Sequence, residues 1–277
     1  VLSLHVMRRL RRLALFFFLS NFSSFFWHPA SASTCTKEIV GYYPAWAQWQ
    51  APAFMPGTIP YNLLTTINYA FIQVDAAGNI VPDAGYNTLA ASLVSNAHAN
   101  NVKVLVAIGG AGGCTGYYLQ QNSGNAAWRT TMVNNLLAYI LSWDFDGMVM
   151  DWEFPGLTYG SPPGCAWGSK SAALCTSDRT NFISLMTAMR TAFNGAPKTL
   201  YMSVALPSTQ WYGACYNGPA MTMFDTIEPM AYDFHGDWEG HIGHNAQLYM
   251  PPVDNTYPSH GGVLSGSASV TYWSTAQ

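Results

Sequence analysis

Short apolar runs alternate along this chain with longer stretches whose apolar residues recur at helical spacing. The runs cover 39–43, 67–74, 102–108, 147–153, 200–206 and 226–232, and each is bounded by Gly, Pro, Asn or Asp. Helical spacing is clear over 128–140 and 182–193 and weaker over 87–100. Strands that alternate with helices build βα units around a parallel sheet, and near-continuous apolar strands indicate a sheet covered on both faces. The alternation therefore predicts an α/β domain with no internal linker.

Two architectures are built from βα units: a doubly wound sheet and a closed (β/α)8 barrel. The first predicted strand lacks a GxGxxG fingerprint, and the glycines at 109–110 and 112–113 match neither that pattern nor a phosphate loop. A barrel places functional side chains at the carboxyl ends of its strands, where polar residues cluster in this sequence. The pattern favours a TIM-type (β/α)8 barrel.

The charge balance argues against a nucleic-acid partner. Four of the 11 basic residues lie within residues 8–12, which leaves seven for the rest of the chain against 14 acidic residues. Phosphate contacts need clustered Lys and Arg. With 14 % aromatic residues, the chain is better suited to a neutral ligand that is bound by ring stacking.

The first 32 residues are predicted to be a signal peptide. Basic residues at 8–12 precede an apolar stretch at 13–27, and Ala30-Ser31-Ala32 is a small-residue cleavage pattern. A membrane-spanning helix needs roughly 20 nearly unbroken apolar residues, and this stretch is interrupted by Ser and Asn. A lipid anchor at Cys35 would need a different preceding motif. We therefore expect a mature domain over 33–277, secreted to the extracellular space or the periplasm, with no membrane contact after cleavage.

The chain has five cysteines, at positions 35, 114, 165, 175 and 215, all within the expected mature domain. An oxidising compartment favours disulfides, and no CxxC or His-rich spacing suggests zinc. Cys165 and Cys175 lie ten residues apart in one Gly/Pro/Ser-rich stretch, so a disulfide between them is expected. The odd number means either a free thiol or a partner cysteine that this sequence lacks.

The segment FDGMVMDWEFPG (Phe145–Gly156) brings two carboxylates to the end of a buried strand. Alternation along a strand puts Val149, Asp151 and Glu153 on one face, with the two carboxylates about 6.6 Å apart along the chain. Like charges at this distance, in an apolar pocket, raise a pKa, and a Glu that stays protonated near neutral pH can act as a general acid. The alternative is that both residues cap the strand or bind a metal through oxygen ligands.

DGMVMDWE resembles the DGxDxDxE signature of glycoside hydrolase family 18, the chitinases and their relatives. KVLVAIGG (Lys103–Gly110) resembles the family's SxGG motif, and MAYDFHG (Met230–Gly236) resembles its MxYDxxG motif. GYYPAW (Gly41–Trp46) and INYAFIQVD (Ile67–Asp75) resemble its first two strands. The motifs follow in the family's order from about Glu38 to Gln277, so the chain is identified as a member by resemblance.

The resemblance implies retaining, substrate-assisted hydrolysis of β-1,4-linked N-acetylglucosamine polymers, without a metal or an organic cofactor. Glu153 matches the acid/base, and Asp151 matches the residue that binds the acetamide N–H and stabilises positive charge. Tyr232 matches the hydroxyl that donates to the acetamide oxygen, Asp233 a sugar-binding carboxylate, and Met230 a residue of the sugar pocket. The substrate's own acetamido oxygen is the nucleophile in this family, an exception to the scheme of two catalytic carboxylates. Chitin is the expected substrate, and a monomer is expected.

Two positions depart from the family pattern. Val149 stands where the signature has an Asp, and Ala107 stands where SxGG has Ser. In the family, this Asp neighbours the Asp151 position, and the Ser supports it. Losing both together avoids a buried hydroxyl without a partner. We expect apolar packing in place of this network, with catalysis retained and an altered pH profile.

Several aromatic residues could stack on sugar rings. Trp152 points away from the carboxylates by strand parity and is expected in the core. Trp46 and Trp238 lie just beyond strand ends and are candidates for substrate binding, as is Phe71. The remaining tryptophans are expected to pack between sheet and helices.

The sequence predicts about six of the eight barrel strands. Residues 267–277 resemble the helix that precedes strand seven, so the natural gene is expected to continue past Gln277, and the chain as written is expected to be unstable and inactive. A hydrolase of peptidoglycan or N-glycan cores, or a non-catalytic chitin-binding lectin, remains an alternative on the same fold. Val149 favours the lectin, whereas the retained Glu153 favours an enzyme.

Overall fold

The computed structural model describes residues 37–160, 162, 165–208, 210–216, 218–238, 242–250 and 264–275. The expected signal peptide over 1–32 and the cysteine at position 35 lie outside these residues. Among the described helices, none combines the length and the apolar character that crossing a membrane requires.

The described residues form a sheet with six parallel strands. These are β1 (Val40–Pro44), β2 (Thr66–Val74), β4 (Lys103–Gly109), β5 (Gly147–Asp151), β8 (Tyr201–Pro207) and β9 (Thr226–Met230). Each lies within two residues of its predicted bounds. Strands that follow one another along the chain are neighbours in the sheet, and a short β3 (Ile80–Pro82) pairs antiparallel with β2. A doubly wound sheet reverses its strand order at a switch point. The order here does not reverse, which confirms the incomplete (β/α)8 barrel.

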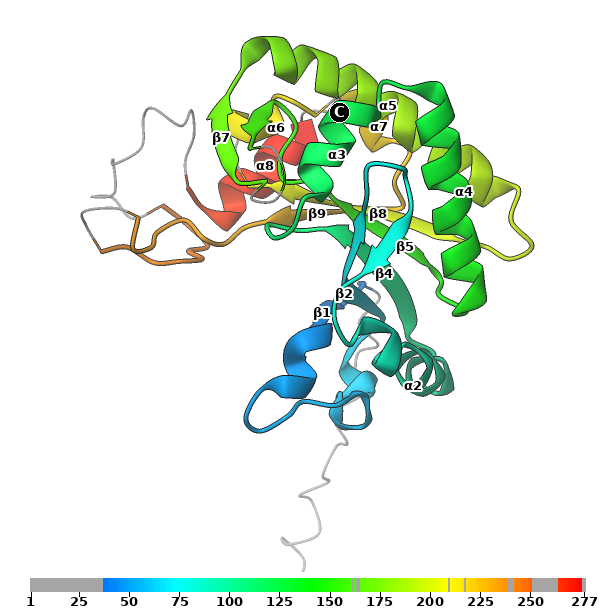
Figure 1. The fold of residues 1–277 in the computed structure, drawn as a ribbon. Coiled ribbons are helices and arrows are strands. Elements are labelled where there is room, and N and C mark those ends of the chain that lie inside the picture. The colour runs from blue at the N-terminus through cyan, green and yellow to red at the C-terminus, as the bar shows by residue number, and fades with distance from the viewer. Residues whose placement is uncertain are drawn as a thin grey trace, which may run out of the picture. The chain divides into compact units, whose positions relative to one another are not determined.

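Helices cover the outer face of this sheet (Figure 1). They are α2 (Tyr86–Ala99), α4 (Ala126–Ser142), α5 (Ala172–Asn194) and α8 (Gly266–Thr275), and α4 packs along α5. The outward-facing Met148 and Met150 of β5 are fully buried in the main core, together with Trp152. Trp152 contacts Phe182 of α5 with ring centroids 6.4 Å apart, which confirms its predicted place in the core.

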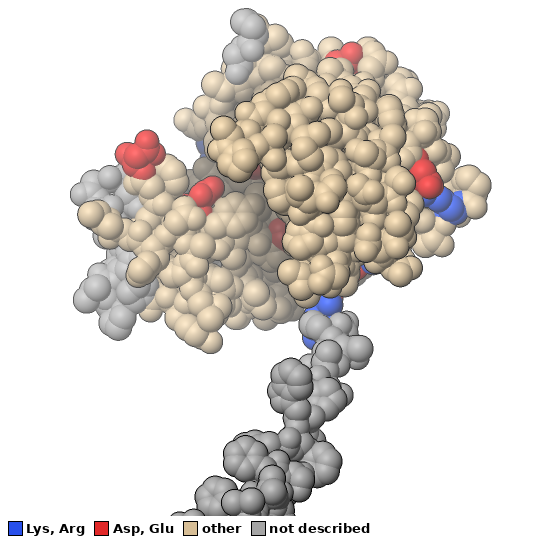
Figure 2. All heavy atoms as spheres, turned by 90° about the horizontal axis from the view of Figure 1, so that it is seen from below, with Lys and Arg blue, Asp and Glu red and all other residues tan. Residues whose placement is uncertain are grey.

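Shorter elements lie in the connections, and the sequence patterns did not predict them. They are η1 (Ala45–Trp49), η2 (Pro56–Thr58), η3 (Tyr61–Leu63), α3 (Thr115–Asn122), α6 (Gln210–Gly213), α7 (Gly218–Met221), and the antiparallel hairpin of β6 (Leu157–Tyr159) and β7 (Trp167–Lys170). Charged side chains are few and scattered on the face of the molecule in Figure 2.

The predicted disulfide between Cys165 and Cys175 is wrong. Cys165 pairs with Cys114, 51 residues away, and Cys175 pairs with Cys215, 40 residues away. Cys165 leads into β7 beside the loop that follows β4, whereas Cys175 lies on α5 beside the segment that follows α6. Each cysteine therefore ties its element to a different neighbouring connection.

The inner face of the sheet carries a separate cluster of small apolar side chains. We call Ala70, Ala107, Val149 and Ala205 the apolar cluster; all are almost completely buried, and Phe71 and Met230 pack against them. In register, Ala107 of β4 lies opposite Val149 of β5. Apolar packing thus occupies the positions where the family motifs have Asp and Ser, as expected.

Candidate active site

The two carboxylates of the signature motif lie at the end of β5. Asp151 is the last strand residue and is 3 % exposed, whereas Glu153 lies two residues later and is half-buried. The Asp151 carbonyl oxygen accepts a hydrogen bond of 2.9 Å from the Gly110 amide. Gly109 has φ +106°, and a Cβ there would lie 2.2 Å from that same oxygen. Only glycine lets β4 end this close to the carboxylates.

Burial and like charge both raise the pKa of these carboxyl groups. For Asp151, burial is the larger cause, followed by the negative charge of Glu228 on β9. For Glu153, burial comes first, followed by the charges of Asp151 and Asp233. A Glu whose pKa is raised well above its ordinary value keeps its proton near neutral pH and can donate it to a leaving group.

The residues that follow β9 lie beside these carboxylates. Tyr232 is 48 % exposed, and burial, with the charges of Asp151 and Glu153, raises its pKa to about 12. Its hydroxyl is therefore protonated at neutral pH and can donate a hydrogen bond. Asp233 adopts φ +54° and accepts a hydrogen bond of 3.0 Å from the Asn245 side chain, which holds this left-handed turn.

A cavity of about 610 Å³ joins the two strand ends. Five of the predicted site residues line it: Glu153, Met230, Tyr232, Asp233 and Trp238. Asp151 is not among the lining residues, and its side chain is almost completely buried. Trp46 and Phe71 do not line the cavity; instead their rings stack on each other with centroids 6.1 Å apart.

An aromatic wall that the sequence analysis did not assign to the site lines the same cavity. It consists of Phe154, Trp167, Trp211 and Tyr212. The Phe154 ring stacks on Tyr212 with centroids 4.6 Å apart and contacts Trp167 at 5.7 Å. Trp167 is 46 % exposed, so one part of its ring faces solvent. Its position two residues after Cys165 was the signal that could have predicted a fixed aromatic residue.

The chain on both sides of Glu153 is held by hydrogen bonds. The Tyr216 hydroxyl donates to the Trp152 carbonyl at 2.6 Å. Asp178 of α5 accepts from the Gly156 amide at 2.7 Å and from the Gln120 side chain at 2.8 Å. These bonds come from elements far apart in sequence and fix the backbone that carries Glu153.

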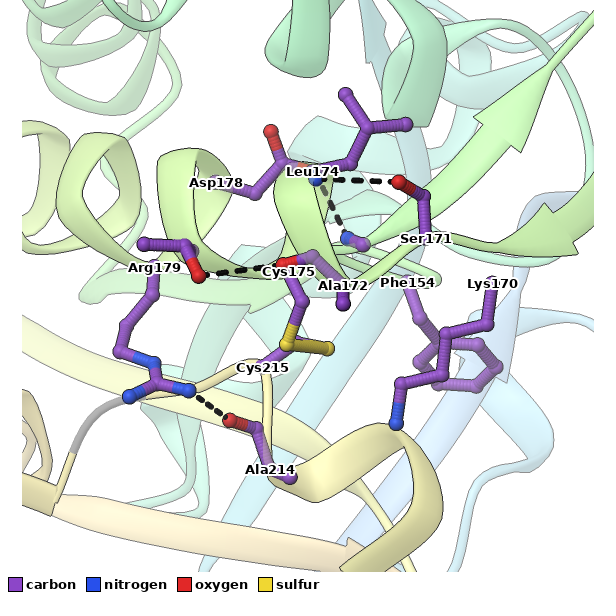
Figure 3. The surroundings of a disulfide bond; sticks show 12 residues. Phe154, Lys170, Ser171, Ala172, Leu174, Cys175, Asp178, Arg179, Ala214 and Cys215 are labelled. Carbon is purple, nitrogen blue, oxygen red and sulfur yellow. Dashed lines mark hydrogen bonds between the residues drawn. A yellow bond between two sulfur atoms is a disulfide. The ribbon is translucent and has the colours of Figure 1, made fainter.

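A disulfide joins the segment that follows α6 to α5 (Figure 3). Cys175 of α5 is joined to Cys215, just beyond α6, and Arg179 donates a hydrogen bond of 2.6 Å to the Ala214 carbonyl. The segment that carries Trp211 and Tyr212 is thereby attached to α5.

Comparisons with known proteins agree with this geometry. The model of the glycosyl hydrolases family 18 matches residues 38–277. The chain is 29 % identical over 246 residues to mouse chitotriosidase-1, and 26 % identical over 271 residues to probable chitinase 2 of Drosophila melanogaster. These alignments cover 85 % and 88 % of this chain, but 49 % and 50 % of the relatives. The chain therefore spans about half the length of these two proteins.

Solved structures give the same result for the fold. The crystal structure of catalytic domain 2 of the Ostrinia furnacalis group II chitinase superposes with a TM-score of 0.74 at 27 % identity. The superposition covers 86 % of this chain and 60 % of that domain.

Proposed function

Because this chain belongs to glycosyl hydrolases family 18, we propose that it hydrolyses β-1,4-linked N-acetylglucosamine polymers, with chitin as its substrate. One observation carries the proposal: Glu153, with its raised pKa, faces a cavity lined by aromatic rings and by Tyr232 and Asp233. A variant of the Ostrinia furnacalis domain has been crystallised with penta-N-acetylchitooctaose. That complex supports an N-acetylated sugar chain as the ligand.

In the proposed mechanism, Glu153 protonates the glycosidic oxygen as the bond from that oxygen to the anomeric carbon breaks. The carbonyl oxygen of the substrate's acetamido group attacks the anomeric carbon and forms a cyclic oxazolinium ion. Asp151 accepts the acetamide N–H and stabilises the positive charge, and the Tyr232 hydroxyl donates to the acetamide oxygen until it attacks. Water then opens the ring with the Glu153 carboxylate as general base, which retains the anomeric configuration. The near-complete burial of Asp151 supports a role as stabiliser and not as nucleophile.

We further propose that the protein is secreted and acts as a monomer. The disulfides Cys114–Cys165 and Cys175–Cys215 are typical of an oxidising compartment, which agrees with a cleaved signal peptide over residues 1–32. Trp46, Phe71 and Trp238 are proposed to contact the sugar chain beyond the reacting ring.

The test compares N-acetylated chitin oligosaccharides with fully deacetylated oligomers of equal length, using the purified full-length protein. Release of diacetylchitobiose from the acetylated series alone is the expected result, since only that series carries the nucleophile. Cleavage of peptidoglycan alone, or of both series equally, would contradict the proposal.

The Glu153→Gln variant tests the lectin alternative, which the apolar Val149 favours. If the protein is an enzyme, the variant binds chitin oligosaccharides but releases no sugar, while the wild type binds and cleaves them. If both proteins bind and neither cleaves, the protein is a lectin.

A further inference from the structure

A group of polar side chains lies on the inner face of the sheet and is not used by the mechanism above. We call Tyr42, Asn68, Ser203 and Glu228 the polar cluster. They come from β1, β2, β8 and β9, and Glu228 lies two residues before Met230 of the sugar pocket. In register, Glu228 is opposite Ala205 of the apolar cluster, so the two clusters adjoin.

Glu228 is the centre of this cluster. The Asn68 side-chain amide donates a hydrogen bond of 2.7 Å to its Oε2, and the Ser203 hydroxyl donates to its Oε1. The Tyr42 hydroxyl also hydrogen-bonds to Glu228. Both carboxylate oxygens thus accept hydrogen bonds, an arrangement that favours the ionised form of Glu228. Burial acts in the opposite direction and is the larger influence on its pKa, which is raised.

Asp151 has two carboxylate neighbours, Glu153 on the cavity side and Glu228 on the inner face of the sheet. Asp151 Oδ1 is buried and accepts no hydrogen bond from any described residue. Besides burial, the negative charge of Glu228 raises the Asp151 pKa, and Asp151 and Glu153 also repel each other. Val149, two residues before Asp151 on the same strand face, supplies no carboxylate.

Other titratable groups also face this pair. Burial raises the pKa of Tyr42, Tyr216 and Tyr232, and the negative charge of Asp151 raises it further. Each of these hydroxyls therefore stays protonated at neutral pH. Glu38 faces Glu228 from the start of β1, but it forms an ion pair of 2.9 Å with Lys103. On the inner face of the sheet, Glu228 is therefore the group whose negative charge acts on Asp151.

We propose that Glu228 is a positioning residue that acts on the reaction through Asp151, as a half-buried carboxylate on the inner face of the sheet in place of the one absent at position 149. The hydrogen bonds of the polar cluster favour the ionised form of Glu228, and Ala205 of the apolar cluster lies opposite it in register. The effect on the Asp151 proton stands by itself, whereas the effect on turnover rests on the proposed function.

The test is Glu228→Gln in the full-length protein, because Gln keeps the shape and an acceptor oxygen but removes the charge. Titration of the Asp151 carboxyl carbon by ¹³C NMR is expected to move to lower pH by about one unit. The acid limb of kcat/KM on chitin oligosaccharides is expected to move in the same direction. An Asp151 titration that is unchanged in Glu228→Gln overturns the proposal.

Two further variants complete the test. Glu38→Gln removes a carboxylate that faces Glu228 but does not contact Asp151, and it is expected to leave the Asp151 titration in place. Ser203→Ala removes one hydrogen bond from Glu228 and keeps its carboxyl group, so a smaller downward shift is expected, and this variant decides the matter if Glu228→Gln does not fold. The NMR readout needs no turnover, so a shift in a protein that does not cleave chitin refutes only the proposed function.

Discussion

Two regions adjoin Asp151 at the end of β5. The cavity side contains Glu153 and the aromatic wall, whereas the inner side contains the apolar cluster and the negatively charged Glu228. The cavity side is held by the Cys175–Cys215 disulfide, by a hydrogen bond that Tyr216 donates and by one that Asp178 accepts. The inner side carries the small side chains of the apolar cluster beside the half-buried carboxylate of Glu228. Residues that match the family motifs thus lie on one side of this strand end, whereas Ala107 and Val149 on the other side differ from those motifs.

The largest expected effect lies on the cavity side. Glu153→Gln removes the proton donor and keeps the shape of the side chain, so kcat should fall by on the order of 10²- to 10⁴-fold, with little change in binding. Steady-state kinetics and binding of an uncleaved oligosaccharide measure the two quantities. Glu38→Gln, at the opposite end of the strands, serves as the control. A Glu153→Gln variant with near-normal kcat would show that Glu153 is not the proton donor.

The next effect concerns the contact between β4 and Asp151. Gly109→Ala would place a Cβ 2.2 Å from the Asp151 carbonyl oxygen at φ +106°, and should cost about 1–3 kcal/mol of folding stability. Gly112→Ala is the matched control, because a Cβ there meets nothing within 4 Å. Denaturant unfolding of both variants measures the difference. Equal stabilities would mean that β4 does not constrain the end of β5.

The next prediction concerns a carboxylate restored on the inner side of Asp151. In Val149→Asp with Ala107→Ser, a second negative charge beside Asp151 raises the Asp151 pKa. The acid limb of kcat/KM should therefore move to higher pH, by about one unit. This direction is opposite to that expected for Glu228→Gln, so combining the substitutions should bring the limb back toward the wild-type position. Superimposable pH profiles for Val149→Asp/Ala107→Ser and wild type would show that this position does not influence Asp151.

The smallest expected effect tests the aromatic wall. Trp167→Ala removes a ring that contacts Phe154, and should raise KM for long chitin oligosaccharides by about 2- to 10-fold through lost stacking. The shortest cleavable oligosaccharide is the internal control, since it need not extend along the wall. A uniform loss for all lengths would indicate a general packing role for Trp167.

The sequence predicted the strands and main helices well because their apolar patterns are local. It also identified Glu153, Tyr232 and Asp233, which lie at strand ends within recognisable motifs and which the structure brings to one cavity. Prediction failed where partners are distant in sequence. The disulfide of Cys165 was wrong because its partner lies 51 residues away, across a hairpin that the pattern did not predict.

Glu228 was overlooked for a related reason. A single Glu within a short strand has no local pattern that separates a buried carboxylate from an exposed one. Its significance depends on Asn68, which is 160 residues away and donates to it across the inner face. Trp167 escaped notice because Gly- and Pro-rich residues around it are typical of a loop.

In the proposed mechanism, Glu153 and Asp151 support a reaction in which the substrate supplies its own nucleophile. Proton NMR of the first product released from a chitin oligosaccharide, recorded before mutarotation, tests this most directly. The proposed mechanism predicts that the new reducing end appears as the β-anomer, because attack by the acetamido group and then by water inverts the anomeric carbon twice. Initial appearance of the α-anomer would contradict it.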